Sequence, residues 1–290
     1  MQAPQAGNYF IDCRESALEK LRTIKHIICV ASGKGGVGKS TTAVNLAVAL
    51  RQQGFKTGLL DADIYGPSQP LMLGVKSGTR PKLIDKKYME PIIAHGIESN
   101  SMGYLVESNT AMVWRAPMIV GAFNQMLRDT LWSDLDFLIV DMPPGTGDIQ
   151  LSLTQSVVLT GAIIVTTPQD VALLDARRGI EMFRKVNVPL LGVVENMGIH
   201  ICSNCGHAEA IFGEGGGERL SQDYGVEVIG SLPLDLSIRE HTDSGVPIVV
   251  AQPDSKVAQA YHRLARTMIE KVNQLSASAK PGPTISISDD

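Results

Sequence analysis

The chain lacks three features that would assign it to a membrane, secreted or nucleic-acid-binding class. No uninterrupted apolar run reaches the roughly 18 residues that a membrane-spanning helix needs. Residues 1–25 contain Asp12, Glu15 and Glu19 and have no apolar signal-peptide core. Lys and Arg total 26 against 30 Asp and Glu, and a net charge of −4 gives no general attraction to nucleic acids or anionic membranes. We therefore expect no membrane and no nucleic-acid partner.

The same absences predict an intracellular protein. No arginine-rich leader is present, which favours a bacterial cytoplasmic location. The alternative is the mitochondrial matrix, if a targeting peptide has been removed.

Cysteines are few, and only two of the four form a pattern. Cys13 lies in a polar N-terminal segment, and Cys29 lies in an apolar run where we expect a buried, inert thiol. Cys202 and Cys205 are separated by two residues, a spacing that lets two thiols bind one soft metal or one cluster from a tight turn. Two thiolates are half of a tetrathiolate site, so a second chain would have to complete it.

Other interpretations of the cysteine pair stay open at this stage. His200 and His207 lie close to it in sequence and could complete a zinc site within one chain. A redox dithiol is less favoured, because the pair does not begin a helix of a thioredoxin-like unit.

A glycine-rich segment gives the strongest functional signal. It reads Gly33-Lys34-Gly35-Gly36-Val37-Gly38-Lys39-Ser40-Thr41 and lies between the apolar run 26–31 and an expected helix at 43–50. Backbone N–H groups of such a loop, together with the helix N-terminus, bind phosphates that bulkier side chains would exclude. We expect Lys39 to reach the β and γ phosphates of ATP, Ser40 to bind Mg²⁺ and Thr41 to lie near the α-phosphate.

Carboxylates follow two apolar segments that we expect to be strands. Asp61 and Asp63 follow residues 57–60, and Asp141 follows residues 137–140. Ligands of open parallel sheets bind at the carboxyl ends of the strands, so these acids should meet a nucleotide in the glycine-rich loop. We expect Asp141 to act on Mg²⁺ and residues 141–148 to form a switch that senses the γ-phosphate. A helix N-cap with an adjacent solvated acid is the competing interpretation of Asp61 and Asp63.

Alternating strands and helices predict the fold. Further strands are expected at 96–105, 162–167, 190–195 and 226–231, and an amphipathic helix at 114–131 with Met118, Phe123 and Leu127 on its apolar face. A last helix is expected at 256–272, where ordinary packing on the sheet is favoured over docking on a membrane surface. This order predicts an α/β fold with a mostly parallel sheet covered by helices on both faces. The expected organisation is a leader at 1–24, one ATPase domain at 25–275 with a cysteine-containing insertion at 198–212, and a disordered tail at 276–290.

Lys34 is a second lysine within the loop, where it would repel Lys39 unless a polyanion lay between them. The loop resembles the deviant phosphate loop of the superfamily of MinD, ParA and the nitrogenase iron protein. This resemblance implies a P-loop NTPase that forms a homodimer, in which Lys34 reaches the partner's nucleotide. It also implies that Asp63 positions the attacking water with support from Asp61, and that Asn196 and Pro233 lie where adenine is bound.

All of the motifs together, from about residue 24 to 275, resemble the Mrp/ApbC family of iron-sulfur cluster carrier ATPases and its mitochondrial relatives. The segments that carry this resemblance, besides the loop, are Asp-Ala-Asp-Ile-Tyr-Gly-Pro-Ser at 61–68, Asp-Met-Pro-Pro-Gly-Thr-Gly-Asp at 141–148 and the cysteine pair. The resemblance implies a [4Fe-4S] cluster held between subunits by Cys202 and Cys205, received from scaffold donors and passed to apoproteins, with slow ATP hydrolysis. The competing function is a positioning ATPase of the MinD or ParA kind, with a structural zinc ion at the cysteine pair.

Overall fold

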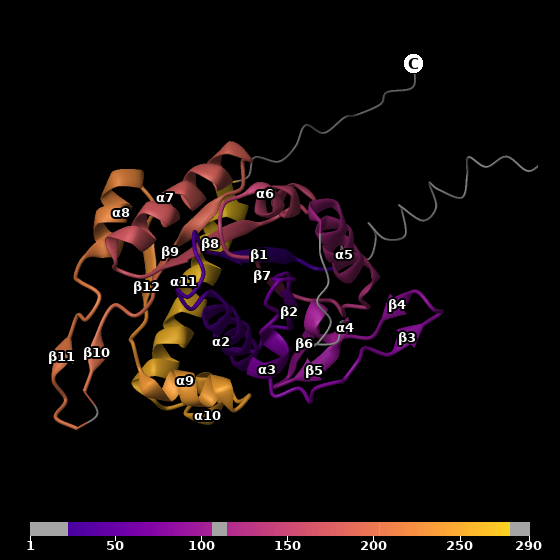
Figure 1. Ribbon diagram of the computed structural model, residues 1–290, viewed down its shortest axis with the longest axis horizontal. Helices are drawn as coiled ribbons and strands as arrows, with labels where there is room; N and C mark the ends of the chain where they lie inside the picture. The colour runs from indigo at the N-terminus through magenta and orange to yellow at the C-terminus, as the bar shows by residue number, and fades with distance from the viewer. Residues whose placement is uncertain (1–22, 106–114, 203, 279–290) are drawn as a thin grey trace, which may run out of the picture.

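Apolar strands assemble into one eight-stranded sheet in the computed structural model, which describes residues 23–105, 115–202 and 204–278 (Figure 1). In spatial order the strands are β12 (Val228–Ser231), β9 (Leu190–Glu195), β8 (Gly161–Thr166), β1 (His26–Ala31), β7 (Phe137–Asp141), β2 (Thr57–Asp61), β6 (Ile97–Ser101) and β5 (Ile92–Ala94). Neighbouring strands are parallel except for β5, which pairs antiparallel with β6. The prediction of a mostly parallel sheet is confirmed.

Helices cover both faces of the sheet, and each strand sends alternate side chains to the two faces. Ile28 and Val30 of β1 pack in the core beneath α2 (Lys39–Gln52), α10 (Ile248–Ala251) and α11 (Lys256–Ser278). Ile27 and Cys29 belong to the opposite core, beneath α5 (Ala116–Asp129), α6 (Asp148–Gln155), α7 (Asp170–Lys185) and α8 (Gly216–Tyr224). Because both faces are covered, every residue of β2, β7 and β8 is buried, which explains their continuous apolar sequences.

Smaller elements lie along the edges of this core. They are the short helices α3 (Gln69–Met72), α4 (Met102–Leu105) and α9 (Leu236–Asp243), and the hairpins β3 (Leu83–Ile84) with β4 (Tyr88–Met89) and β10 (His200–Ile201) with β11 (Ala208–Glu209). Figure 1 shows the two hairpins projecting from opposite sides of the body. Among the described residues, no helix combines the length and the apolar character that crossing a membrane requires.

Several predicted boundaries differ from the structure. Strand β12 begins at Val228 rather than at 226, and the expected strand at 96–105 is divided into β6 and α4. Met118, predicted on the apolar face of α5, is exposed, whereas Phe123 and Leu127 are buried as expected. Helix α11 continues to Ser278, so residues 276–278 do not belong to the predicted tail. The leader up to residue 22, with Cys13, and the tail from residue 279 lie outside the described residues.

The last helix packs as an ordinary core helix. Its residues Val257, Tyr261, Leu264, Met268 and Val272 are all buried against the sheet and α2. The apolar face of α11 is therefore occupied within the chain. This packing contradicts the idea that the helix docks on a membrane surface.

Candidate nucleotide-binding site and cysteine hairpin

The glycine-rich loop connects β1 to α2 at the carboxyl edge of the sheet. Gly36 and Gly38 have φ angles of 81° and 82°, in the region that favours glycine. A Cβ on Gly33 would lie 2.3 Å from the carbonyl carbon of Asp175 in α7, so glycine is required there by close packing. A Cβ on Gly35 would meet nothing within 4 Å, which leaves this side of the loop open. The loop is thus packed against α7 at Gly33 and open at Gly35, and a phosphate-binding loop needs such an open side.

Lys39 lies at the centre of the site. Its Nζ forms an ion pair with Asp141 Oδ1, donates to Ser40 Oγ at 3.2 Å and lies 3.9 Å from Asp63 Oδ2. Asp141 is completely buried and Lys39 is only 6% exposed. The structure therefore brings together four residues that the sequence predicted from three separate motifs.

Asp61 is also completely buried, and it organises the loop that follows β2. Its carboxylate accepts hydrogen bonds from the N–H of Asp63 at 3.1 Å, the N–H of Gln69 at 3.2 Å and the Ser101 hydroxyl at 2.9 Å. Burial, and then the neighbouring Asp141, raise the pKa of Asp61 to about 7. Burial also raises the pKa of Asp63. With three protein donors, Asp61 is a structural acceptor, and Asp63 is the more accessible of the two acids.

Two residues of this network were not predicted from the sequence. Gln69 Nε2 donates to Asp141 Oδ2 at 2.8 Å and to the main-chain oxygen of Ser40 at 3.0 Å, and Ser101 ends β6 beside Asp61. A signal for Gln69 did exist, because it follows the Asp61–Ser68 motif directly. Ser101 had no such signal, since only strand pairing brings it to Asp61.

The chemistry of these groups fits a magnesium-nucleotide complex. Asp63 and Asp141 share one lysine, so the cluster carries excess negative charge in a buried position even when Asp61 holds a proton. Carboxylate and hydroxyl oxygens are the ligands that Mg²⁺ prefers. Gln69 Oε1 is buried and has no hydrogen-bond partner, which leaves one acceptor of the cluster unsatisfied.

Asn196 follows β9 and contacts the loop from behind. Its Nδ2 donates to the main-chain oxygen of Val37 at 2.8 Å, and a Cβ on Gly38 would lie 2.1 Å from that Nδ2. Pro233 follows β12, the neighbour of β9, and so lies at the same edge of the sheet. The recognition of adenine by these two residues stays a prediction.

The segment after β7 is attached to the start of the loop. Gly145, with φ of 103°, donates its N–H to the main-chain oxygen of Ser32 at 2.9 Å. The Ser32 hydroxyl in turn donates to the main-chain oxygen of Lys34 at 2.9 Å. The predicted switch is therefore in contact with the loop that holds both lysines, while the reach of Lys34 to a partner's nucleotide stays a prediction.

The cysteine pair lies at the end of the β10–β11 hairpin. The Cys202 N–H donates to the oxygen of His207 at 2.9 Å, and the Gly206 N–H donates to the oxygen of Cys202 at 2.8 Å, with φ of 72° at Gly206. Hydrogen bonds from the N–H groups of Cys205 and Asn204 lower the pKa of the Cys202 thiol. Cys205 is exposed and Cys202 is half-buried, so the turn presents the cysteine pair at the surface.

The two histidines do not complete a metal site here. His200 Nδ1 lies 3.0 Å from the main-chain oxygen of Leu234, which fixes the ring against the body of the protein. Within residues 23–105, 115–202 and 204–278, no three His, Cys, Asp or Glu side chains come close enough together to hold a metal ion. The alternative of a zinc site formed by Cys202, Cys205 and these histidines in one chain stays a prediction.

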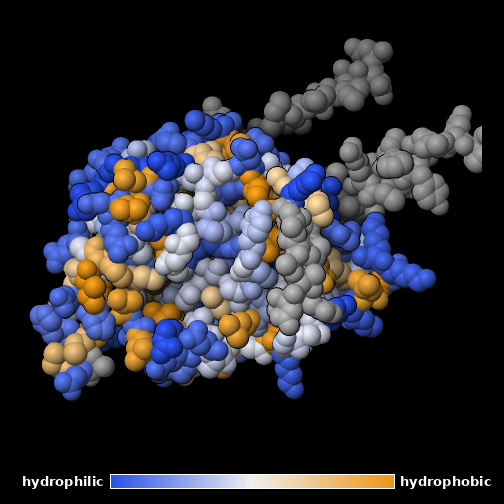
Figure 2. All heavy atoms as spheres, in the orientation of Figure 1, coloured by the Kyte–Doolittle hydropathy of each residue, from blue (hydrophilic) through white to orange (hydrophobic). Residues whose placement is uncertain are grey.

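Exposed apolar side chains lie on and beside the hairpin, as the hydropathy colouring of Figure 2 shows. They belong to Ile199, Ile201, Ile211 and Leu236, each at least 41% exposed. Exposed apolar side chains therefore flank the hairpin that carries the two cysteines.

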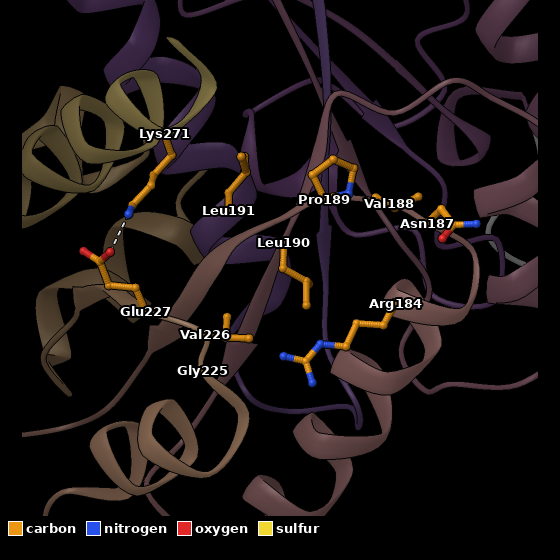
Figure 3. Close-up of a pocket in the computed structure, with 10 residues that line it drawn as sticks. All are labelled: Arg184, Asn187, Val188, Pro189, Leu190, Leu191, Gly225, Val226, Glu227 and Lys271. Atoms are coloured by element: carbon orange, nitrogen blue, oxygen red, sulfur yellow. Dashed lines mark hydrogen bonds and ion pairs between the residues drawn. The ribbon is translucent and has the colours of Figure 1, made fainter. Parts of the chain in front are cut away.

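A cavity of about 550 Å³ lies at the opposite edge of the sheet, near the start of β9 (Figure 3). Its charged lining residues include Lys271 and Glu227, which form an ion pair with each other, and Arg184. None of the predicted site residues lines it. The cavity is therefore separate from the nucleotide site.

The fold and the loop geometry define a P-loop NTPase of the MinD and ParA type. The sequence matches the ParA family described as NUBPL iron-transfer P-loop NTPase over residues 23–269. The chain belongs to this family.

Curated relatives carry related names. The chain is 61% identical over 253 residues to the iron-sulfur cluster carrier protein of Pseudomonas fragi, covering 87% of this chain and 88% of the relative. It is 58% identical over 242 residues to the protein of the same name in Escherichia coli K12, covering 83% of this chain and 65% of that protein. The mouse iron-sulfur cluster transfer protein NUBPL is 49% identical over 251 residues, covering 86% and 78%. The family is thus one of iron-sulfur cluster carrier and transfer proteins.

Solved structures agree with the fold. A nucleotide-binding protein from Archaeoglobus fulgidus in complex with ADP has a TM-score of 0.73 at 35% identity, covering 85% of this chain and 96% of that one. The cell division ATPase MinD of Pyrococcus furiosus has a TM-score of 0.63 at 25% identity, covering 85% and 99%.

Proposed function

We propose that this protein is a homodimeric ATPase that binds a [4Fe-4S] cluster between its subunits and transfers it to apoproteins. The observation that carries the proposal is the surface turn with Cys202 and Cys205, which offers two sulfur ligands to one metal centre and has no third ligand beside them among the described residues. A tetrathiolate site then requires the same turn from a second copy. The apolar side chains around the turn suit such a contact.

ATP and Mg²⁺ bind at the glycine-rich loop in this proposal. Ser40 and Asp141 would hold Mg²⁺, and Lys39 would contact the phosphates in place of Asp141. Asp63 orients the attacking water, and Lys34 reaches the nucleotide of the partner subunit. The carboxylates of Asp63 and Asp141 support this assignment, because Lys39 is the cation paired with both of them. A bound Mg²⁺ would take the place of the lysine at Asp141.

Nucleotide state and cluster binding are coupled through the segment after β9. Asn196 contacts the loop through Val37, and six residues later the same segment reaches Cys202. The N–H of Gly198 donates to the oxygen of Leu232 at 3.0 Å, so the start of the hairpin is tied to β12. Slow hydrolysis would then change how the hairpin presents its cysteines. A Lys39→Ala protein that transfers its cluster to an apoprotein as well as the wild type would contradict this coupling.

Anaerobic purification, a visible absorption spectrum and iron, sulfide and zinc analysis test the cargo. We expect a brown protein with about four irons per dimer, and a colourless Cys202→Ala/Cys205→Ala variant. Analytical ultracentrifugation of both proteins tests the shared site, since the cluster should shift the wild type alone toward dimer. Stoichiometric zinc without colour, after attempted cluster reconstitution, would refute the carrier proposal and favour a MinD-like ATPase with a structural metal.

A further inference from the structure

Gln69 connects three parts of the nucleotide site that are far apart in sequence. Its side-chain nitrogen bonds Asp141 Oδ2 at 2.8 Å and the main-chain oxygen of Ser40 at 3.0 Å. Its own N–H bonds Asp61 Oδ2 at 3.2 Å. The residue is 1% exposed. One buried glutamine therefore holds the ends of β2 and β7 against the first turn of α2.

The two carboxylate oxygens of Asp141 have different partners, and the proposed function affects only one of these two contacts. Oδ1 pairs with Lys39 and Oδ2 accepts from Gln69. In the proposed function Lys39 turns to the phosphates, so its bond to Asp141 is lost. Gln69 is held by its backbone bond to Asp61 and keeps its bond to Asp141. The orientation of the Asp141 carboxylate in the loaded site then depends on Gln69.

The oxygen of the same side chain indicates that the network is incomplete without a ligand. Gln69 Oε1 is buried and has no hydrogen-bond partner, a state that costs free energy in a folded protein. It belongs to the amide that contacts Asp141 and the backbone of Ser40, the two residues assigned to Mg²⁺. The amide thus fixes the carboxylate with its nitrogen and offers an acceptor to a donor that arrives with the ligand.

We propose that Gln69 is a positioning residue that holds Asp141 in the orientation needed for Mg²⁺, and so determines how strongly Mg²⁺ tightens nucleotide binding. This inference rests on the proposed ATP and Mg²⁺ site. It does not depend on the iron-sulfur cargo, so it can be tested on the full chain without a cluster.

The test measures the affinity of a fluorescent ATP analogue in excess Mg²⁺ and in EDTA, for the wild type and Gln69→Met. Methionine keeps the length and flexibility of glutamine but cannot donate to Asp141 or Ser40. We expect the gain in affinity from Mg²⁺ to fall about tenfold or more, the usual effect of losing a hydrogen bond to a charged group. The affinity in EDTA should stay near that of the wild type.

Gln150→Met is the matched control. Gln150 lies on α6, is 3% exposed and also has an unpartnered side-chain oxygen, but it lies outside the network around Asp141. It should keep the full Mg²⁺ gain. Thermal unfolding in EDTA checks that the variants fold, and Gln69→Leu is the second variant if Gln69→Met does not.

The outcomes separate this inference from the proposed function. A Gln69→Met protein with the wild-type Mg²⁺ gain, or with equal losses in Mg²⁺ and in EDTA, would show that Gln69 has no positioning role. A wild type that binds no nucleotide, or binds it without regard to Mg²⁺, would instead refute the proposed nucleotide site.

Discussion

The nucleotide site and the cysteine hairpin are built in opposite ways. The site around Lys39 is buried at the carboxyl ends of parallel strands, and Asp61 and Asp141 each have partners from two other elements. The hairpin has two strands of two residues each, and within the part of the chain that the structure describes its cysteines are bonded only inside their own turn. The nucleotide site is therefore held in place by the core, whereas substitutions in the cysteine hairpin should have little effect on the core.

The largest expected effect is that of removing the central cation. Lys39→Ala leaves Asp141 buried beside Asp61 without a counter-charge, and breaking a buried pair in this way costs about 3–5 kcal/mol of stability. Nucleotide binding should be lost as well. Urea unfolding monitored by circular dichroism measures the first effect. Lys25→Ala, which removes the pair of an exposed lysine with Asp136, is the control and should cost less than about 1 kcal/mol.

The pH dependence of stability should report Asp61. Its pKa is about 7 in the folded protein and near 3.8 when exposed, so between these values the folded state binds more protons than the unfolded state. Stability is therefore greatest below pH 3.8 as far as this group is concerned, and it falls as pH rises to about 7, by on the order of 3 kcal/mol.

Asp61→Asn should flatten this slope between pH 4 and 7, whatever its effect on stability at a single pH. Urea midpoints at a series of pH values measure it. An unchanged slope in the variant would mean that Asp61 does not hold a proton in the folded state.

Two glycines of the same loop offer a sharper test of packing. Gly33→Ala places a Cβ 2.3 Å from the backbone of α7, an overlap that should cost about 1–3 kcal/mol and lower the melting temperature. Gly35→Ala meets no atom within 4 Å and should leave the melting temperature nearly unchanged. Equal shifts in the two variants would indicate that α7 does not press on the loop.

The smallest expected effect on stability belongs to the hairpin. Cys202→Ala/Cys205→Ala removes side chains that contact neither core, so the free energy of unfolding of the cluster-free protein should change by no more than in other surface substitutions, about 0.5 kcal/mol. The melting temperature measures this change. Nucleotide affinity of the cluster-free protein should stay the same. A large loss of stability would show that the two regions are less independent than their contacts indicate.

The fold was predictable because its signals are local and continuous. The apolar run 137–140 predicts a strand, and the glycines at 33–38 predict a loop. A parallel sheet then places the carboxyl ends of its strands at one edge, beside that loop. The meeting of Lys39, Asp63 and Asp141 followed from that rule. The prediction was weaker at Met118, where helical spacing alone does not show how wide the buried face of α5 is.

Contacts between side chains were the part that the sequence could not provide. Asp61 acts as a structural acceptor partly because Ser101 donates a hydrogen bond to it. Ser101 lies 40 residues away in sequence and is brought to Asp61 by the pairing of β2 with β6. The bond from Asn196 to Val37 depends likewise on the order of the strands. The contact of His200 with the main-chain oxygen of Leu234 is another that spacing in the sequence does not encode.

The pair between Lys39 and Asp141 has a consequence for the life of the empty protein. The lysine supplies, from within the chain, part of the charge balance that a loaded site would receive from its ligand. Without a ligand, the protein therefore stays folded. It should then resist proteases, because degradation follows the population of opened states.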